Sequence, residues 1–206
     1  SGKTTTLYSS ISRLNTGSVN IMTLEDPVEY GLPGISQTQM DAKVGLTFAR
    51  ALRNILRQDF NIVMVGEIRD LETAEAAFEF ASTGRLAFST LHTNSAAGAI
   101  TRLRDMGVET YLMASTLRAV MAQRLVRKLC DVCKEPATAG AAEYEALDLP
   151  PAESFTHYTP KGCMACGNTG FHGRIAIYEL LVVDNAVRNL LHADATEDAI
   201  EAVAFA

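Results

Sequence analysis

The stretch Asn61-Ile62-Val63-Met64-Val65-Gly66-Glu67 decides the fold of this chain. Its apolar residues follow one another without a polar break and are rich in β-branched side chains, which is typical of a strand buried on both faces. Such strands belong to parallel sheets, and open parallel sheets bind ligands at the carboxyl ends of their strands. Glu67 stands at that end. It is therefore a candidate for holding Mg²⁺ or orienting a water molecule, with helix capping as the alternative role.

Strands and helices alternate on both sides of this stretch. Apolar runs at 19–24 and 86–91 predict two more buried strands, and alternating apolar and polar residues at 35–40 predict a half-exposed one. Helices are predicted at 4–14, 48–57, 71–81, 94–106 and 111–129. Thr47 is a candidate N-cap for the second of these helices. The alternation predicts an α/β fold in which helices cover both faces of a mainly parallel sheet.

The sequence opens on Ser1-Gly2-Lys3-Thr4, which matches the second half of the phosphate-binding loop G-x-x-x-x-G-K-[ST]. In such a loop, backbone N–H groups surround the phosphates, the lysine reaches the outer phosphates and the hydroxyl holds Mg²⁺. Alone, this tetrapeptide is more often a surface turn. Its place before a predicted helix and upstream of acid-ended strands indicates ATP and Mg²⁺ binding instead. The loop's first glycine and preceding strand are missing, so we expect a fragment that begins inside its own nucleotide site.

Two other predicted strands end in polar residues. Glu25-Asp26-Pro27-Val28-Glu29 follows the first strand, and Glu25 is a candidate general base, although the cluster is equally compatible with an acidic turn. Ser89-Thr90-Leu91-His92-Thr93 ends a later strand, and His92 is a candidate contact to the γ-phosphate or an ordinary satisfied polar group. The candidate catalytic residues are therefore Glu25, Glu67 and His92.

Four cysteines form two close pairs, Cys130-x-x-Cys133 and Cys163-x-x-Cys166. The two-residue gap lets both sulfurs of a turn face one ion, and two such turns complete a tetrahedron. The 29 residues between the pairs exceed the usual spacing of compact ribbons, so the intervening loop is expected to be large. Zinc is the metal indicated, with iron as a lesser option, and four protein ligands leave no open position for catalysis. Disulfides would need an oxidising compartment, whereas a nucleotide-binding core points to the cytosol.

Composition sets the remaining limits. Hydrophobic content of 48% and charged content of 20% are ordinary for a globular protein. The net charge of −6 argues against general nucleic-acid binding, although Arg118, Arg124, Arg127 and Lys128 leave a local basic patch open. No apolar run approaches the roughly 18 residues that a membrane span requires. We expect a truncated nucleotide-binding core at 1–129, a tetracysteine module at 130–174, and a strand with small helices at 175–206 that is itself cut short.

The order of these motifs resembles the type II/type IV secretion-system ATPase superfamily over nearly the whole chain. Glu67 lies in the segment that matches the Walker B motif, Glu25 in the Asp box and His92 in the His box. The tetracysteine module resembles the type II secretion system protein E branch, with pilus-extension ATPases next. The retraction and conjugation branches lack that module. One departure is Arg85, where the family has histidine. The other matching segments are Thr47-Phe48-Ala49-Arg50, Leu56-Arg57-Gln58-Asp59, Ile100-Thr101-Arg102-Leu103-Arg104-Asp105-Met106-Gly107 and Gln123-Arg124-Leu125.

The resemblance implies a RecA-like P-loop core and an ATP-hydrolysing motor of bacterial type II secretion. It implies a cytoplasmic homo-hexamer that is peripheral at the inner membrane, where a platform protein and a cytoplasmic adaptor are its partners. ATP would be hydrolysed between an N-terminal domain and this one, which implies that residues 1–206 alone are inactive. Lys3 and Thr4 would bind phosphate and Mg²⁺, Glu25 would activate the water and His92 would sense the nucleotide state.

Three alternatives remain open from the sequence. A pilus-extension ATPase shares the same motifs. A DNA-handling P-loop ATPase would need a basic, aromatic surface near the cysteines, but residues 134–160 are acidic and alanine-rich, so no nucleic-acid partner is expected. A non-enzymatic zinc scaffold would not need Glu25, Glu67 and His92 together.

Overall fold

The chain forms two compact units in the computed structural model, which describes residues 2–148, 150 and 156–205. One unit comprises Ser1–Gln123 and Tyr178–Ala206, and the other comprises Arg124–Ile177. The division falls within two long strands that pair with each other, β5 (Ala119–Leu129) and β8 (Phe171–Val182). The predicted domains 1–129, 130–174 and 175–206 remain a prediction, because compactness alone does not show which segments fold independently.

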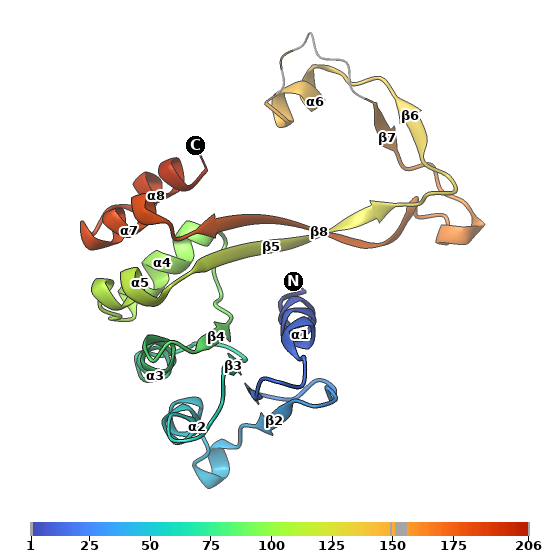
Figure 1. Cartoon of the computed structure of the whole chain (residues 1–206). Coiled ribbons are helices and arrows are strands. Elements are labelled where there is room, and N and C mark those ends of the chain that lie inside the picture. The colour runs from blue at the N-terminus through green and yellow to red at the C-terminus, as the bar shows by residue number, and fades with distance from the viewer. Residues whose placement is uncertain (1, 149, 151–155, 206) are drawn as a thin grey trace. The chain divides into compact units, whose positions relative to one another are not determined.

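A four-stranded parallel sheet forms the centre of the first unit (Figure 1). Its strand order is β2-β1-β3-β4, and every neighbouring pair is parallel. The predicted α/β fold with a parallel sheet is therefore confirmed. The strands are β1 (Ile21–Glu25), β2 (Ser36–Gln39), β3 (Ile62–Val65) and β4 (Leu86–Ser89).

Helices cover both faces of β3, which explains its unbroken apolar sequence. Ile62 and Met64 share one hydrophobic cluster with Tyr8 and Ile11 of α1 (Lys3–Leu14). Val63 and Val65 belong to a second cluster on the other face, which includes residues of α2 (Phe48–Ile55) and α3 (Leu71–Ser82). Figure 1 shows α1 on one side of the sheet and these two helices on the other.

Several helices begin at a polar residue whose side chain caps the first turn, just before the periodic apolar residues of the helix. Thr47 accepts a hydrogen bond from the backbone N–H of Arg50 at 3.3 Å, so the predicted N-cap of α2 is confirmed. Ser95 caps α4 (Ala96–Asp105) in the same way, by accepting from the N–H of Gly98 at 2.9 Å. Local sequence thus fixes where these helices begin.

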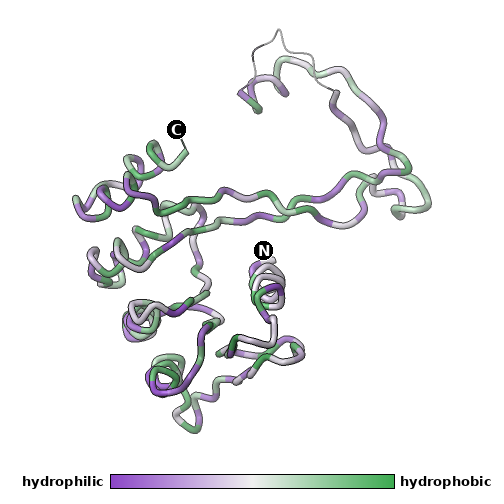
Figure 2. Tube along the Cα trace, viewed as in Figure 1, coloured by the Kyte–Doolittle hydropathy of each residue, from purple (hydrophilic) through white to green (hydrophobic). Residues whose placement is uncertain are grey.

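The predicted helix at 111–129 is wrong. Only α5 (Thr110–Thr116) is helical, and β5 follows from Ala119. Its alanine, leucine, methionine and arginine residues favour a helix locally, but pairing with β8, more than 40 residues later, overrides that preference. Figure 2 shows hydrophilic and hydrophobic residues interleaved along both strands, and most residues of the two strands are exposed or half-buried.

The predicted burial of the strand at 86–91 is also wrong. The strand ends at Ser89, and Leu86 is 38% exposed. In the part of the chain that the structure describes, β4 is an edge strand of its sheet, which leaves one of its sides without a neighbouring strand.

The C-terminal segment contributes to the core of the first unit. The helices α7 (Asn185–His192) and α8 (Glu197–Ala204) bury Leu191 and Ile200 in the same cluster as Val63. The second unit is smaller and holds an antiparallel pair, β6 (Glu135–Ala137) and β7 (His157–Thr159), and the helix α6 (Ala141–Ala146). Two short 3-10 turns, η1 (Ala42–Val44) and η2 (Met164–Cys166), complete the elements. Among the described residues, no helix combines the length and apolar character needed to cross a membrane.

Candidate functional site

Glu67 and His92 meet at the carboxyl ends of β3 and β4. The Nε2 atom of His92 lies 3.3 Å from Oε2 of Glu67, and the guanidinium of Arg69 donates to Oε1 of the same carboxylate. The hydrogen bond from Arg69 is the main reason why the pKa of Glu67 is lowered, and its partial burial acts in the opposite direction. Glu67 is therefore a carboxylate at neutral pH, which is the form that binds a metal ion or a water proton.

Backbone contacts fix the two loops that carry this pair. The hydroxyl of Thr90 donates to the carbonyl oxygen of Gly66 at 2.8 Å, and the N–H of Ile68 donates to the carbonyl of Thr90 at 3.0 Å. The loop that holds His92 is thus tied directly to the residues on either side of Glu67. The side chain of His92 is 76% exposed, so it is free to turn toward a ligand at this edge.

Lys3 reaches the same edge from the first turn of α1. Its Nζ donates to the carbonyl oxygen of Leu91 at 3.0 Å, one residue before His92. Gly2 caps the helix with a left-handed backbone at φ 79°, and among the described residues this end of the helix has no side-chain cap hydrogen bond. The N–H groups of the first turn are donors for an anion. Thr4 belongs to that turn, and Ser1 lies outside the described residues.

Glu25 is held differently from Glu67. It is buried at the end of β1, where Oε1 accepts from the hydroxyl of Thr23 at 2.5 Å and from Nε2 of Gln37 at 3.1 Å. The hydroxyl of Tyr8 donates to Oε2. These three hydrogen bonds hold the buried carboxylate of Glu25 in its position. Activating a water would require Glu25 to exchange at least one of them.

Tyr8 is a site residue that the sequence did not reveal. It is buried on α1, and its ring lies 4.7 Å from that of Tyr30 in an edge-to-face arrangement. Burial, followed by the hydrogen bond to Glu25, raises the pKa of Tyr8 to about 12, so its hydroxyl remains a donor. The sequence alone indicates only that Tyr8 occupies an apolar position of a helix. In the structure, it connects α1 to the end of β1 through its hydrogen bond to Glu25.

Replacing Tyr8 by phenylalanine is expected to lower the free energy of unfolding by about 1–3 kcal/mol, because a buried oxygen of Glu25 loses its donor. Chemical denaturation measures the change. Tyr30→Phe is the matched control, since Tyr30 is exposed, and its effect should stay within about 0.5 kcal/mol. Equal effects of the two variants would contradict the special role of the Tyr8 hydroxyl.

The structure brings the four predicted metal ligands together in the second unit. Their sulfur atoms all lie within 4.8 Å of one another, with Sγ–Sγ distances of 4.0 Å for Cys130–Cys163 and 3.8 Å for Cys133–Cys166. Four sulfurs around one zinc ion at the usual bond length lie about 3.8 Å apart, so the cluster fits a tetrahedral metal site. The same distances are about twice a disulfide bond, and the cysteines are free thiols.

Backbone donors favour the thiolate form of one ligand. Burial by itself raises the pKa of Cys166, but the N–H groups of Cys163 and Gly170, each 3.2 Å from its sulfur, help to lower it to about 6. Burial raises the pKa of Cys133 to about 11. Gly167 follows the second pair with a left-handed φ of 60°, which allows a tight turn there. The donor set is thus suited to a metal ion that prefers sulfur.

Comparison with known proteins gives one consistent family. A family model described as type II/IV secretion system protein matches residues 1–205. The chain is 56% identical over 197 residues to type II secretion system protein E of Pseudomonas aeruginosa, covering 96% of this chain and 39% of that protein. It is 52% identical over 201 residues to type II secretion system ATPase E of Vibrio cholerae, covering 98% of this chain and 40% of that protein. The chain therefore spans less than half the length of these relatives.

Solved structures of similar fold agree with that family. A crystal structure of the pilus retraction motor PilT with bound ADP matches with a TM-score of 0.68 and 31% identity, covering 98% of this chain and 50% of that one. The ATPase DotB of Legionella pneumophila matches with a TM-score of 0.63 and 27% identity, covering 98% of this chain and 47% of that one. Both proteins are similar to this chain over nearly its whole length.

Proposed function

The chain belongs to the type II/IV secretion system protein family, and we propose that it is the C-terminal part of an ATPase that powers bacterial type II secretion. The observation that carries the proposal is the meeting of Lys3, Glu67 and His92 at one edge of the parallel sheet. That edge is where open α/β sheets bind nucleotides. Relatives named as type II secretion ATPases support this function over pilus extension.

Each residue at this edge has a distinct proposed role. The N-terminus of α1 and Lys3 bind the outer phosphates of ATP, and Thr4 binds Mg²⁺. Mg²⁺, when bound, neutralises charge on the transferred phosphate. Glu67 holds Mg²⁺ or its water, and His92 reports the nucleotide state to the loop after β4. Glu25 is proposed as the water-activating carboxylate, released from one of its three partners when the nucleotide binds.

The tetracysteine cluster is proposed to hold one structural zinc ion through Cys130, Cys133, Cys163 and Cys166. The ion would supply folding energy to the second unit and take no part in hydrolysis, because four protein ligands fill a tetrahedral site. On the family likeness alone, we propose that the longer protein forms a cytoplasmic homo-hexamer that is peripheral at the inner membrane. It would work with a platform protein and a cytoplasmic adaptor.

Comparing ATP turnover by residues 1–206 and by the longer protein tests the proposed function. We expect the longer protein to hydrolyse ATP, with stimulation by liposomes that carry the platform protein. Residues 1–206 are expected to bind a fluorescent ATP analogue poorly and to hydrolyse ATP at background rate, because they contain only the Gly2-Lys3-Thr4 half of the phosphate-binding motif. A longer protein without turnover would overturn the proposal. Micromolar binding with turnover by residues 1–206 would contradict only the expected effect of truncation.

A further inference from the structure

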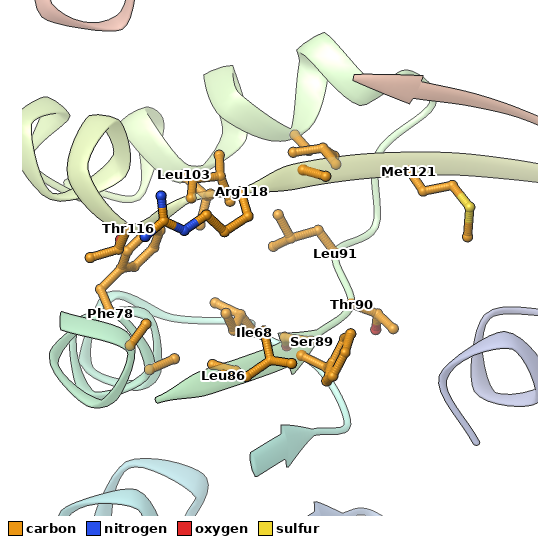
Figure 3. Close-up of a pocket in the computed structure, with 18 of the residues that line it drawn as sticks. Ile68, Phe78, Leu86, Ser89, Thr90, Leu91, Leu103, Thr116, Arg118 and Met121 are labelled. Atoms are coloured by element: carbon orange, nitrogen blue, oxygen red, sulfur yellow. The ribbon is translucent and has the colours of Figure 1, made fainter. Parts of the chain in front are cut away.

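The loop after β4 carries His92 and is held at both ends. Thr90, at its first end, is hydrogen-bonded to the residues on either side of Glu67, and Figure 3 shows Thr90 where the loop leaves β4. Ser95, at its other end, is the N-cap of α4. Only two residues separate His92 from Ser95, so the position of His92 depends on where α4 begins.

Two carboxylates from the C-terminal part of the chain hold the start of α4. Glu179 of β8 accepts a hydrogen bond from the backbone N–H of Ala96, the first residue of that helix. Oε1 of Glu197, in the first turn of α8, accepts from the hydroxyl of Ser95 at 2.9 Å. Figure 1 shows α8 beside α4. Negative charge is favoured at this end because the N–H groups of a first helical turn have no partners within the helix.

The hydroxyl of Ser95 is shared between its own helix and α8. Its Oγ accepts from the N–H of Gly98 at 2.9 Å, which by itself is a complete N-cap, and it donates to Glu197 in addition. A Cβ atom at position 98 would lie 2.7 Å from this Oγ and 3.0 Å from Oε1 of Glu197. Only glycine leaves room for this approach, although glycine is a poor helix former. The contact with Glu197 therefore does more than cap a helix, because it attaches α4 to α8.

The other end of α4 is attached to the same segment. Arg104, in the last turn of α4, donates to the carbonyl of Ala195 at 3.0 Å and forms an ion pair with Asp194. Between the two ends, Ile100 of α4 and Ile200 of α8 are buried in one apolar cluster. The helix is thus fixed to the C-terminal segment along its length. A shift of that segment would move the start of α4 and the loop before it.

We propose that Glu179 and Glu197 are positioning residues for His92. They fix the start of α4 against β8 and α8, and they thereby hold the loop that presents His92 to Glu67 at the nucleotide edge of the sheet. The effect on turnover rests on the proposed function, because it takes His92 to be a nucleotide contact. The positioning itself needs no nucleotide, so it can be measured separately.

Histidine ring signals in nuclear magnetic resonance spectra test the positioning without any nucleotide. Residues 1–206 contain four histidines, so selective labelling gives four ring signals. Glu67→Gln shows where the signal of His92 lies once its carboxylate partner is lost. Glu179→Ala and Glu197→Ala should each shift the His92 signal in that same direction, because the loop no longer holds the ring beside Glu67. A His92 signal that stays in place in both alanine variants overturns the proposal.

Matched variants separate positioning from a general disturbance. His157 and His172 lie in the second unit, so their signals are internal references that should not move. Glu201→Ala makes the same change at an exposed position of α8 and should leave the His92 signal in place. Glu197→Gln keeps an oxygen acceptor and should restore most of the original signal position. Gly98→Ala removes no hydrogen-bonding side chain, yet it should shift the signal because its Cβ atom displaces the carboxylate. A shift in Glu201→Ala equal to that in Glu197→Ala would overturn the proposal.

A double-mutant cycle in the longer protein tests the effect on turnover. Glu197→Ala should lower ATP turnover by about tenfold or more, because a misplaced catalytic group is costly. In a protein that already carries His92→Ala, Glu197→Ala should cause no further loss, since it acts only through His92. Equal losses in the two backgrounds would show a merely structural role and overturn the proposal. A longer protein without turnover would refute the proposed function, and the ring signals of residues 1–206 would still decide the positioning.

Discussion

Replacing Glu67 by glutamine in the longer protein is expected to lower ATP turnover by about a hundredfold or more. The amide has almost the same shape as the carboxylate, so the loops after β3 and β4 should keep their positions. What is lost is the negative charge that faces His92 and Arg69. The lowered pKa of Glu67 means that this charge is present throughout the physiological range. The expected loss is therefore mainly in turnover, with a smaller loss of stability because the charge-assisted hydrogen bond from Arg69 is weakened.

Lys3→Ala is also expected to lower ATP turnover by about a hundredfold or more, because it removes the cation that contacts the loop before His92. Steady-state turnover at saturating ATP measures both variants, and circular dichroism checks that they fold. Glu72→Gln is the matched control because it makes the same chemical change at an exposed position of α3, where Glu72 forms an ion pair with Arg53 on the surface. Near-normal turnover by Glu67→Gln would move the catalytic role to Glu25. Near-normal turnover by both Glu67→Gln and Lys3→Ala would remove this edge of the sheet from the mechanism.

The predictable part of this molecule is the part whose signals are local. The run from Ile62 to Val65 predicts a strand that is covered by helices on both faces, because its apolar residues point to both sides of the sheet. Thr47 predicts the start of a helix, because its hydroxyl accepts a hydrogen bond from the N–H three residues later. The four cysteines predict a metal-binding cluster, because a gap of two residues lets both sulfurs of a pair bind one ion. In each case, the residues that interact are close in sequence or chemically specific.

The mistaken and missed features depend on partners far away in sequence. Residues 119–129 have helical propensity but pair with β8, which no local pattern predicts. The link between Tyr8 and Glu25 joins α1 to the end of β1 across a buried core. The exposure of Leu86 depends on the edge position of β4, which an apolar run cannot reveal. Such features require the tertiary arrangement, because propensity differences of less than 1 kcal/mol per residue are easily overridden.

Removing two ligands of one cysteine pair is expected to abolish metal binding and loosen the second unit. In the described part of residues 124–177, the buried residues are Cys130, Cys133, Cys166 and Gly170. These described residues therefore include no apolar core of their own, and the stability of the unit should come largely from the metal. Zinc content should fall from about one equivalent per chain to near zero in Cys130→Ser/Cys133→Ser. The sheet should remain folded, because its clusters contain none of these residues.

Elemental analysis gives the metal content, and hydrogen exchange compares residues 124–177 with β3 in the same sample. Val132→Ser is the matched control, because it introduces serine between the two cysteines at a side chain that is 76% exposed and is not a ligand. It should keep its zinc and its protection. Chelation of the unmodified protein should loosen 124–177 as the double variant does, since both remove the same ion. Full metal occupancy in the double variant would show that the ion is held elsewhere. Loss of metal without faster exchange in 124–177 would show that the peptide alone holds that unit together.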